Sequence, residues 1–328
     1  MKALVTGATG LIGSNVARAL LKRGHQVRTL IRKGSDTSNI DDIEVEHVLG
    51  DIRDPDSLGA AIGGCDAVFH VAALYSFWEP EPEIFYDINV KGTINVLEAA
   101  LNAKVDRVIY TSTVATIAPS SSKSLSNEEC WATDDGIYGN YKRTKVLAER
   151  KAFELHKKGL PVVVVNPTTT IGPWDNKPTP SGKIIVDFML GRMPAYMETG
   201  FNVVDVEDVA EGHVLAMEKG IPGQRYILGN RNMTLQEFLG RLGKATGRKA
   251  PKIKIPTWFA LGMAYIDTMI EGSILSKEPR IPLEGVMAAR HPIFVDCSKA
   301  VKELGMPQTP IEQTLDKAVS WFRERSYA

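Results

Sequence analysis

Cysteine is scarce in this chain of 328 residues. The three present, Cys65, Cys130 and Cys297, are odd in number and far apart, so they suggest a reducing compartment rather than a disulfide framework. The first predicted strand begins at residue 2, which leaves no room for a signal peptide. We therefore expect a cytoplasmic protein.

An excess of charge of either sign is also absent, because 39 basic residues balance 39 acidic ones. No basic block stands out, which argues against a nucleic-acid partner. The six histidines have no metal-ligand spacing, so we expect no metal site; His70 falls in a predicted strand and His213 in a predicted helix. The sequence contains no Gly-x-Ser-x-Gly elbow and no Walker motif, so it does not support a hydrolase or a kinase.

Long apolar runs are missing as well. The most apolar stretch, residues 258–270, is too short to span a membrane and contains Asp267. We expect it to form a helix that packs on a substrate lobe. Its aromatic and methionine content would also suit an apolar ligand or a membrane surface.

The first motif present is a glycine turn between an apolar segment and an amphipathic one. Residues 2–5 predict a buried parallel strand, and residues 11–22 have the spacing of a helix that ends near Gly24. Three glycines spaced three apart join them: Gly7, Gly10 and Gly13. This order places free N–H groups and the positive end of a helix beside a pyrophosphate, as a nicotinamide dinucleotide requires.

Strands alternate with helices through the first half of the chain, which predicts an α/β fold with a doubly wound parallel Rossmann sheet. Strands are expected at 2–5, 27–31, 45–49, 67–71, 107–110 and 162–165. Prolines interrupt the second half, where helices are expected at 234–246, with Thr234 as N-cap, and at 258–270, 298–304 and 310–325. We expect residues 1–167 to form mainly the dinucleotide-binding core and 168–328 mainly a smaller substrate lobe, with segments near 200–230 returning to the core.

The end of the second predicted strand distinguishes the two nicotinamide cofactors. An NAD-specific site usually offers Asp or Glu to the adenosine ribose there. This chain has Arg32 followed by Lys33, and a guanidinium binds a 2′-phosphate through paired, charge-assisted hydrogen bonds. The sequence therefore favours NADP(H), while the nearby Asp36 keeps NAD(H) open.

A phenol and an ammonium group four residues apart form the second motif. Tyr141 and Lys145 share one face of a predicted helix. An ordinary phenol has a pKa of about 10, and a neighbouring ammonium favours the phenolate. The lysine would also hydrogen-bond the nicotinamide ribose. Ser112 and Thr113, just past the fifth predicted strand, offer a hydroxyl to hold a substrate oxygen.

Nearly the whole chain resembles the extended short-chain dehydrogenases/reductases of the NAD-dependent epimerase/dehydratase family. The matching segments are Gly7-x-x-Gly10-x-x-Gly13, Asp51-Ile52, His70-Val71-Ala72-Ala73, Asn89-Val90-x-Gly92-Thr93, Tyr110-Thr111-Ser112-Thr113 and Tyr141-x-x-Thr144-Lys145-x-x-Ala148-Glu149. The last segment selects Tyr141 over Tyr138, which has Lys142 at the same spacing. The resemblance also assigns the place of the family's catalytic Ser to Thr113, with Ser112 as a neighbour that could share its role.

The resemblance implies a set of site residues and a small-molecule substrate. The implied cofactor contacts are Gly7, Thr9, Gly10, Leu11, Ile12, Gly13, Arg32, Lys33, Asp51, Ile52, Val71, Ala72, Ala73, Ser112, Tyr141, Lys145, Pro167, Thr168 and Thr170. The implied substrate contacts are Tyr75, Trp78, Thr113, Tyr141 and Asn166. The family further implies a homodimer through a four-helix interface.

Two branches of the family compete. Cys130-Trp131, Asn166-Pro167-Thr168 and Arg32 resemble dihydroflavonol 4-reductases, which reduce a ketone with NADPH. Residues 177–182 and 191–196 resemble bacterial hopanoid-associated proteins named as sugar epimerases.

Phe201 stands where nucleotide-sugar epimerases usually have an Arg that meets the phosphates, and an apolar side chain cannot replace that ligand. Arg192, Arg225 and Arg290 are candidates to supply the charge from elsewhere. The aromatic loop 75–78 suits a flat or apolar substrate better than a diphosphate. We therefore expect an NADP(H)-dependent reductase acting on a ketone or aldehyde of a small aromatic or alicyclic molecule. The alternatives are a nucleotide-sugar epimerase or dehydratase with retained NAD, and a non-enzymatic cofactor sensor.

Overall fold

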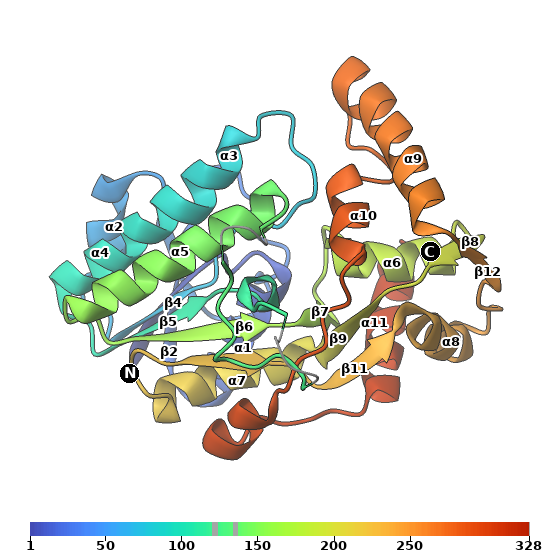
Figure 1. Ribbon diagram of the computed structural model, residues 1–328. Helices are drawn as coiled ribbons and strands as arrows, with labels where there is room; N and C mark the ends of the chain where they lie inside the picture. The colour runs from blue at the N-terminus through green and yellow to red at the C-terminus, as the bar shows by residue number, and fades with distance from the viewer. Residues whose placement is uncertain (120–123, 134–136, 328) are drawn as a thin grey trace.

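A parallel sheet of seven strands forms the centre of the larger lobe in the computed structural model (Figure 1). The structure describes residues 1–119, 124–133 and 137–327. The strand order is β10-β6-β5-β4-β1-β2-β3, which reverses between β1 and β4. The strands are β1 (Lys2–Thr6), β2 (Gln26–Ile31), β3 (Glu46–Leu49), β4 (Ala67–His70), β5 (Arg107–Thr111), β6 (Val162–Pro167) and β10 (Arg225–Leu228).

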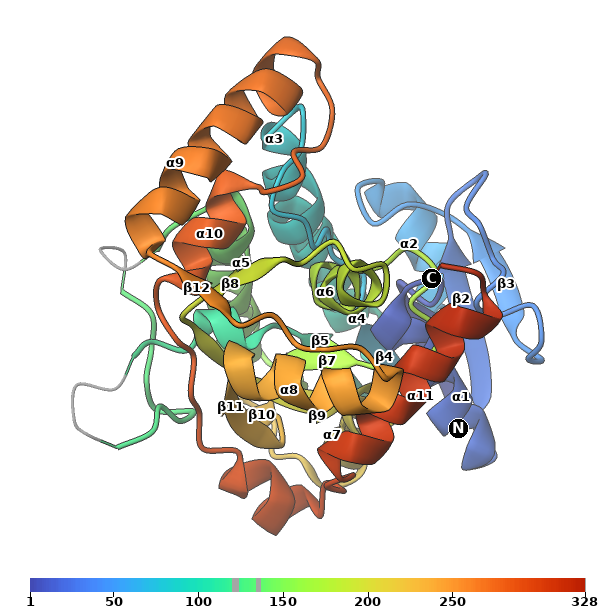
Figure 2. The same ribbon diagram turned by 90° about the vertical axis from the view of Figure 1, so that its right-hand side faces the viewer.

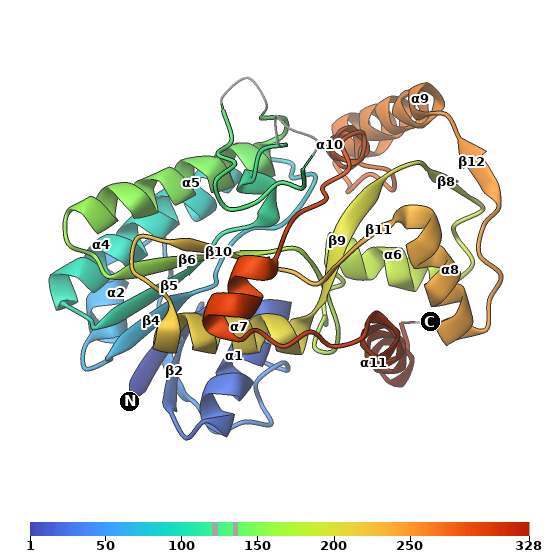
Figure 3. The same ribbon diagram turned by 60° about the horizontal axis from the view of Figure 1, so that its bottom comes forward.

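Helices cover both faces of this sheet (Figures 1 and 3). One layer holds α2 (Pro55–Ile62), α4 (Thr93–Ala103) and α5 (Asn140–Lys157), and the other holds α1 (Leu11–Lys22) and α7 (Val206–Lys219). Alternate strand residues serve the two layers: Leu4 and Val162 pack with the first, while Val5 and Val163 pack with the second. Burial on both faces explains why the strands are continuously apolar.

The predicted Rossmann sheet is confirmed, and the ends of the six predicted strands lie within about two residues of the observed ends. The seventh strand, β10, was not predicted, because a four-residue segment in the proline-interrupted half gives little periodicity. The predicted helix start at Thr234 is also confirmed. The Thr234 hydroxyl accepts a hydrogen bond from the Glu237 amide and the Glu237 carboxylate accepts one from the Thr234 amide, which makes a capping box for α8 (Leu235–Thr246).

The smaller lobe is built from the second half of the chain and faces the viewer in Figure 2. Its helices are α6 (Pro180–Met189), α8, α9 (Thr257–Asp267), α10 (Leu283–Ala289) and α11 (Ile311–Glu324). Its strands are β7 (Thr169–Ile171), β8 (Ala195–Met197), β9 (Gly200–Asp205), β11 (Arg231–Thr234) and β12 (Ile253–Ile255), paired as β11-β9-β7 and β12-β8. A separate apolar core fills this lobe, with Phe188, Phe238 and Phe322 among its members. Short helical stretches at Glu83–Tyr86 (α3), Asp87–Gly92, Val114–Thr116 and Ala300–Leu304 complete the described chain.

The apolar stretch 258–270 is a helix, as predicted, and it packs on the lobe through small side chains, whereas most of its large ones do not. Helix α9 continues as a π-helical segment, Thr268–Ile274, and projects from the smaller lobe beside α10 (Figures 1 and 2). Ala260, Ala264 and Gly272 are its buried residues, and most of its large apolar side chains are exposed. In the part of the chain that the structure describes, no helix combines the length and apolar character needed to cross a bilayer.

Candidate active site

A cavity of about 1940 Å³ lies at the carboxyl ends of the central strands and is closed on its far side by the smaller lobe. Every residue implied as a cofactor contact, from Gly7 to Thr170, lines it. Of the implied substrate contacts, Tyr75, Thr113 and Tyr141 line the cavity. The structure therefore brings both predicted motifs together around one space.

The glycine turn after β1 is constrained by its own packing. Gly7 has a φ of +72°, and a Cβ there would lie 2.7 Å from the backbone of Ala72, which follows the neighbouring strand β4. A Cβ at Gly13 would overlap the carbonyl oxygen of Gly7, so α1 sits directly on the turn. These two glycines allow the strand, the turn and the helix to meet.

Gly10, unlike Gly7 and Gly13, has free space around it. This space shows whether the site fits a dinucleotide. A Cβ at Gly10 would find its nearest neighbour at 3.5 Å, so packing within the protein does not demand glycine there. Gly10 lines the cavity and precedes α1, whose N-terminus has no side-chain cap. The bare helix start and the uncrowded backbone fit a pyrophosphate against the N–H groups of Leu11 and Ile12.

The far end of the cavity, where the adenosine belongs, carries several charged groups. Arg32 and Lys33 follow β2, are exposed and line the cavity. The Asp51 carboxylate pairs with Arg53, whose Nη2 lies 2.7 Å away, and this hydrogen bonding lowers the pKa of Asp51. Asp51 is thus hydrogen-bonded to Arg53, and Arg32 adds a weaker attraction that also lowers its pKa.

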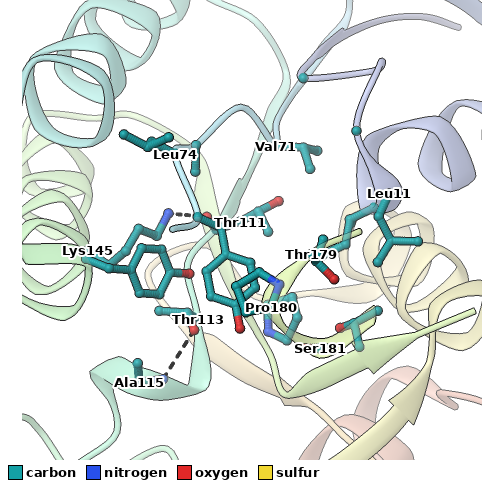
Figure 4. A pocket seen from close by; sticks show the side chains of 18 of the residues that line it. Leu11, Val71, Leu74, Thr111, Thr113, Ala115, Lys145, Thr179, Pro180 and Ser181 are labelled. Carbon is teal, nitrogen blue, oxygen red and sulfur yellow. Dashed lines mark hydrogen bonds between the residues drawn. The ribbon is translucent and has the colours of Figure 1, made fainter. Parts of the chain in front are cut away.

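Helix α5 places Tyr141 in its first turn and Lys145 one turn later. Lys145 is buried, and its Nζ donates a hydrogen bond of 2.8 Å to the carbonyl oxygen of Thr111 (Figure 4). The same Nζ lies 4.8 Å from the centre of the Tyr110 ring. Burial lowers the pKa of Lys145 to about 7, against an opposing effect of Glu149 one turn further on.

Tyr141 and Thr113 meet through their hydroxyl groups. Burial raises the pKa of Tyr141 above its ordinary value, the nearby phenol of Tyr75 raises it further, and a hydrogen bond from the Thr113 side chain opposes both effects. Thr113 Oγ1 also accepts a hydrogen bond from the Ala115 amide at 3.3 Å (Figure 4). The Thr113 hydroxyl has a single proton, which is directed at Tyr141 here and can rotate toward an oxygen in the cavity.

Ser112, the adjacent hydroxyl, is engaged elsewhere. Its Oγ donates to the buried carboxylate of Glu149, which also receives the Thr116 hydroxyl and the Asn166 amide at 2.8 Å each. Arg225 completes this cluster with a hydrogen bond of 2.7 Å to the other carboxylate oxygen. The hydroxyl that faces the reacting phenol is therefore that of Thr113.

Asn166 does not line the cavity. Its amide nitrogen donates to the carbonyl oxygen of Thr113, to Thr116 and to Glu149, and the side chain is fully buried. The predicted substrate contact at Asn166 is thus buried outside the cavity lining, because its hydrogen bonds hold it beneath Thr113. Asn166 instead supports the backbone that presents Thr113.

The rival pair, Tyr138 and Lys142, does not share the geometry of Tyr141 and Lys145. Tyr138 precedes the start of α5 and is 55% exposed. Its ring stacks on His291, with centroids 6.3 Å apart. Lys142 is half-buried, which lowers its pKa. The helical spacing that joins a phenol to an ammonium therefore applies to Tyr141 and Lys145.

The two singled-out histidines are buried and hydrogen-bonded. His70 lies between the hydroxyls of Thr6 and Thr93, at 2.8 and 3.0 Å, and burial lowers its pKa to about 3. His213 lies between Thr111 and the carbonyl oxygen of Val209, and burial lowers its pKa to about 4. Both rings are neutral parts of the core. Among the described residues, no group of three potential metal ligands comes together.

The loop after β4 supplies one aromatic wall of the cavity. The Tyr75 ring lies 4.9 Å from the Tyr141 ring and 6.0 Å from that of Phe77, and both Tyr75 and Phe77 line the cavity. Trp78 does not line it. A Cβ at Gly272 would lie 2.8 Å from the Trp78 indole nitrogen, so Trp78 packs against the π-helical segment that follows α9. The predicted substrate contact at Trp78 thus lies outside the cavity lining, and Phe77 of the same loop lines the cavity.

The smaller lobe supplies the opposite wall, most of which sequence reasoning missed. Its apolar lining residues include Ile184, Phe201, Leu235, Met287, Ala288, Ile293 and Phe294. They come from five separate segments, and no local periodicity connects them. The β-bridge between Phe201 and Ile293 shows how the tertiary fold joins two of these segments.

Hydrogen bonds of Asp175 hold the segment that leads into α6, which forms part of this wall. Asp175 is buried and accepts hydrogen bonds from the amide and the hydroxyl of Thr179. Burial raises the pKa of Asp175 to about 6. Gly182 lies against the carboxylate, where a Cβ would overlap it. Ser181, on the same turn, hydrogen-bonds the Tyr75 hydroxyl and so connects the two walls (Figure 4 labels Thr179, Pro180 and Ser181).

Phe201 and the three candidate arginines bear on the sugar-nucleotide alternative. Phe201 packs edge-to-face on Phe238, with ring centroids 5.5 Å apart, and lines the cavity. Arg192, Arg225 and Arg290 do not line it, and Arg225 is committed to Glu149. None of the three supplies the missing phosphate ligand in this structure.

Comparisons with known proteins give matches along nearly the whole chain. Residues 3–229 match the NAD dependent epimerase/dehydratase family. A Synechocystis sp. protein named "Putative dihydroflavonol 4-reductase" is 42% identical over 327 residues, covering 98% of this chain and 95% of that protein. "Sterol demethylase protein B" of Methylococcus capsulatus is 36% identical over 327 residues, covering 99% of both. The crystal structure of gox2253 is 41% identical, with a TM-score of 0.88 over 99% of this chain and 98% of that one.

The chain belongs to the NAD-dependent epimerase/dehydratase family, within the extended short-chain dehydrogenases/reductases. It is an oxidoreductase of this type, with a nicotinamide dinucleotide as the cofactor that its Rossmann fold accommodates.

Proposed function

We propose that the protein is an NADP(H)-dependent reductase that transfers hydride to a ketone or aldehyde of a small aromatic or alicyclic molecule. The observation that carries the proposal is the composition of the cavity around Tyr141. Tyr75 and Phe77 form one side, and Phe201, Phe294 and further apolar residues form the other. The names of the curated relatives, a flavonol reductase and a sterol demethylase protein, fit the same class of substrate.

The side chains divide the chemistry among them. The bound cofactor supplies the hydride that adds to the carbonyl carbon. Thr113 and Tyr141 donate hydrogen bonds to the carbonyl oxygen, and Tyr141 transfers its proton to that oxygen as negative charge develops, which yields the alcohol. The buried ammonium of Lys145 favours the resulting phenolate. The apolar walls exclude water from the reacting groups.

The preference for NADP(H) rests on Arg32 and Lys33. Both follow β2 and line the adenosine end of the cavity. A guanidinium there forms charge-assisted hydrogen bonds with a 2′-phosphate, whereas Asp36 is the acidic group through which the NAD(H) alternative would act. Asp36 is exposed and its carboxylate accepts a hydrogen bond from the Ser38 amide.

A turnover assay with matched phenol variants tests the proposal. Purified protein, stripped of bound nucleotide, would be supplied with NADPH or NADH and a panel of aromatic and alicyclic ketones, and alcohol would be measured by mass spectrometry. We expect NADPH-dependent reduction. Tyr141→Phe removes the proton donor, so kcat should fall by about 10²–10⁴ while NADPH affinity is kept.

Tyr138→Phe is the matched control, because it removes an exposed phenol three residues away and should retain turnover. Near-wild-type turnover by Tyr141→Phe would refute the assignment. Tightly retained NAD, with interconversion of nucleotide sugars and no net cofactor change, would establish the epimerase alternative instead.

A further inference from the structure

The outer face of α9 and the π-helical segment after it is unusually apolar for an exposed surface. Of the 19 exposed large hydrophobic residues among those described, nine lie between 258 and 275. We call them the α9 face: Trp258, Phe259, Met263, Tyr265, Ile266, Met269, Ile270, Ile274 and Leu275. Trp258 is 73% exposed and Ile274 69%. A contiguous patch of this kind marks an interaction site.

The arrangement reverses that of an ordinary surface helix. The small residues Ala260, Ala264 and Gly272 face inward, and the large apolar ones face outward. The acidic residues of this segment do not interrupt the outer face. Asp267 is half-buried and accepts a hydrogen bond of 2.8 Å from the Ile281 amide, and Glu271 is half-buried. At 1.5 Å per residue the helical face is about 25 Å long.

Basic residues gather at both ends of the α9 face. The segment 248–280 holds six basic and three acidic residues, although the whole chain is neutral. Lys249 and Lys252 precede the helix in the chain, Lys277 and Arg280 follow it, and all four are exposed. Lys254 pairs with Glu198, and Glu278 pairs with Lys183.

We propose that the α9 face lies on the surface of a lipid bilayer that contains anionic lipids. Exposed Trp, Tyr and aliphatic side chains enter the boundary between headgroups and acyl chains, and flanking lysines and arginines are attracted to anionic headgroups. A second copy of the chain fits less well. A two-fold helix pair would bring the like-charged ends, Lys252 and Lys277, toward basic groups of the partner, which disfavours pairing.

This docking mode also brings one wall of the cavity near the bilayer. Helix α10 packs against α9, and Met287 and Ala288 of α10 line the apolar wall of the cavity. An apolar substrate dissolved in the membrane would therefore reach the wall beside the docked helix. The docking itself does not depend on the proposed reductase activity, since it can be measured without cofactor or substrate.

Vesicle co-sedimentation of the full chain tests the proposal. The vesicles would be phosphatidylcholine alone or a 7:3 mixture of phosphatidylcholine and phosphatidylglycerol, roughly one third anionic. We expect at least about tenfold tighter binding to the anionic vesicles, weakened by salt. The triple variant Trp258→Ser, Ile266→Ser, Ile270→Ser should lose about tenfold or more of this binding. Lys252→Gln and Lys277→Gln should each weaken it about fivefold.

The control is the double variant Ile221→Ser, Val301→Ser, which removes exposed apolar side chains outside the α9 face and should bind like the wild type. Thermal melting would show that each variant is folded. Equal binding to neutral and anionic vesicles, or binding unaffected by the triple variant, would overturn the proposal. So would the absence of vesicle binding together with a lipid-free dimer that the triple variant dissociates, which would assign the face to a second copy.

Discussion

Two neighbouring hydroxyl residues, Ser112 and Thr113, have different surroundings at the end of β5. Ser112 donates to the buried carboxylate of Glu149, whereas Thr113 hydrogen-bonds Tyr141. Ser112 is one of four side chains that donate to this buried carboxylate, the others being Thr116, Asn166 and Arg225. Thr113 is therefore the hydroxyl residue that faces Tyr141 in the cavity.

The burial of Lys145 predicts a pH dependence. Its pKa is lowered to about 7 in the folded protein, while burial raises that of Tyr141. Reduction needs the phenol proton and the lysine charge together. We expect kcat/KM for ketone reduction to be highest below about pH 7 and to fall above it as Lys145 loses its proton, measured from pH 5.5 to 9 in a buffer series of roughly constant ionic strength.

Lys145→Arg is the control for this profile. An arginine keeps its charge through the whole range, so the decline above about pH 7 should disappear even if the rate is lower. An unchanged decline in the variant would contradict the assignment to Lys145. The same lowered pKa has a consequence for folding. From about 7 up to the ordinary value of 10.5, the unfolded chain binds a proton that the folded chain does not, so stability rises with pH in this window.

For single residues, the sequence predicted which side chains share a helical face better than which hydrogen bonds they form. The spacing of Tyr141 and Lys145 fixes their relation, because four residues make one helical turn. The directions of Ser112 and Asn166 were not predictable, since the buried cluster around Glu149 sets them. That cluster joins residues more than 100 positions apart, from Ser112 to Arg225.

The start of helix α5 is completed by a residue from the other lobe. Gly139 precedes the helix with a φ of +83° and provides no side-chain cap. The amide of Asn140 donates instead to the carboxylate of Glu284 on α10, and burial raises the pKa of that carboxylate. Tyr138 and His291 stack beside this contact. The first turn of α5, which carries Tyr141, is thus held by a group across the cavity.

Removing this contact should loosen the catalytic turn. We expect Glu284→Ala to lower the free energy of unfolding by about 1 kcal/mol, as loss of a helix cap does. It should also lower kcat severalfold while leaving NADPH affinity unchanged, because α10 lies away from the glycine turn. Urea unfolding and initial rates would measure the two effects. Glu284→Gln keeps an oxygen acceptor and should retain most of both quantities; equal damage from Gln and Ala would argue against the capping role.

Local signals explain which elements the sequence predicted. Thr234 was predicted as the N-cap of α8, and the structure confirms it, with Glu237 three positions later completing a capping box. The cap of α5 comes from a residue 144 positions away, so no local pattern announces it. The same limit applies to α9. The sequence predicted that this segment is an apolar helix. The direction of its apolar face was not predictable, because it depends on how α10 packs against it.

The two lobes together enclose the cavity, so a bound ligand should stabilise the whole molecule. A ligand at about 100 times its Kd adds about 2.7 kcal/mol to the free energy of unfolding. For a chain of this length we expect the Tm to rise by about 5 °C with NADPH and by less with NADH. Thermal melting of nucleotide-free protein measures both shifts.

Arg32→Asp should reverse this order, because a carboxylate repels the 2′-phosphate. The fragments 2′,5′-ADP and 5′-AMP provide a matched pair that differs in that phosphate and lacks nicotinamide. Equal shifts with the two fragments in the wild-type protein would show that Arg32 and Lys33 do not select NADP(H).

For the whole molecule, the sequence predicted the fold class and the cofactor half better than the substrate half. The alternation of apolar strands with amphipathic helices and the spacing of the glycines are local patterns of the Rossmann core. They can therefore be recognised from the sequence alone. The apolar wall is assembled from short segments such as the β-bridge of Phe201 with Ile293. Proline-interrupted segments of this kind carry no period, and only the folded chain shows which of their side chains face inward.

The carboxylate of Glu149 ties together α5, the segment after β5, β6 and β10 through Ser112, Thr116, Asn166 and Arg225. The groups that move a proton are thereby anchored in the sheet, whereas the wall that meets the substrate belongs to other segments. Selection can therefore alter the wall piece by piece without disturbing the anchored groups. Proteins with this arrangement can therefore change their substrate while keeping the same proton-transfer groups.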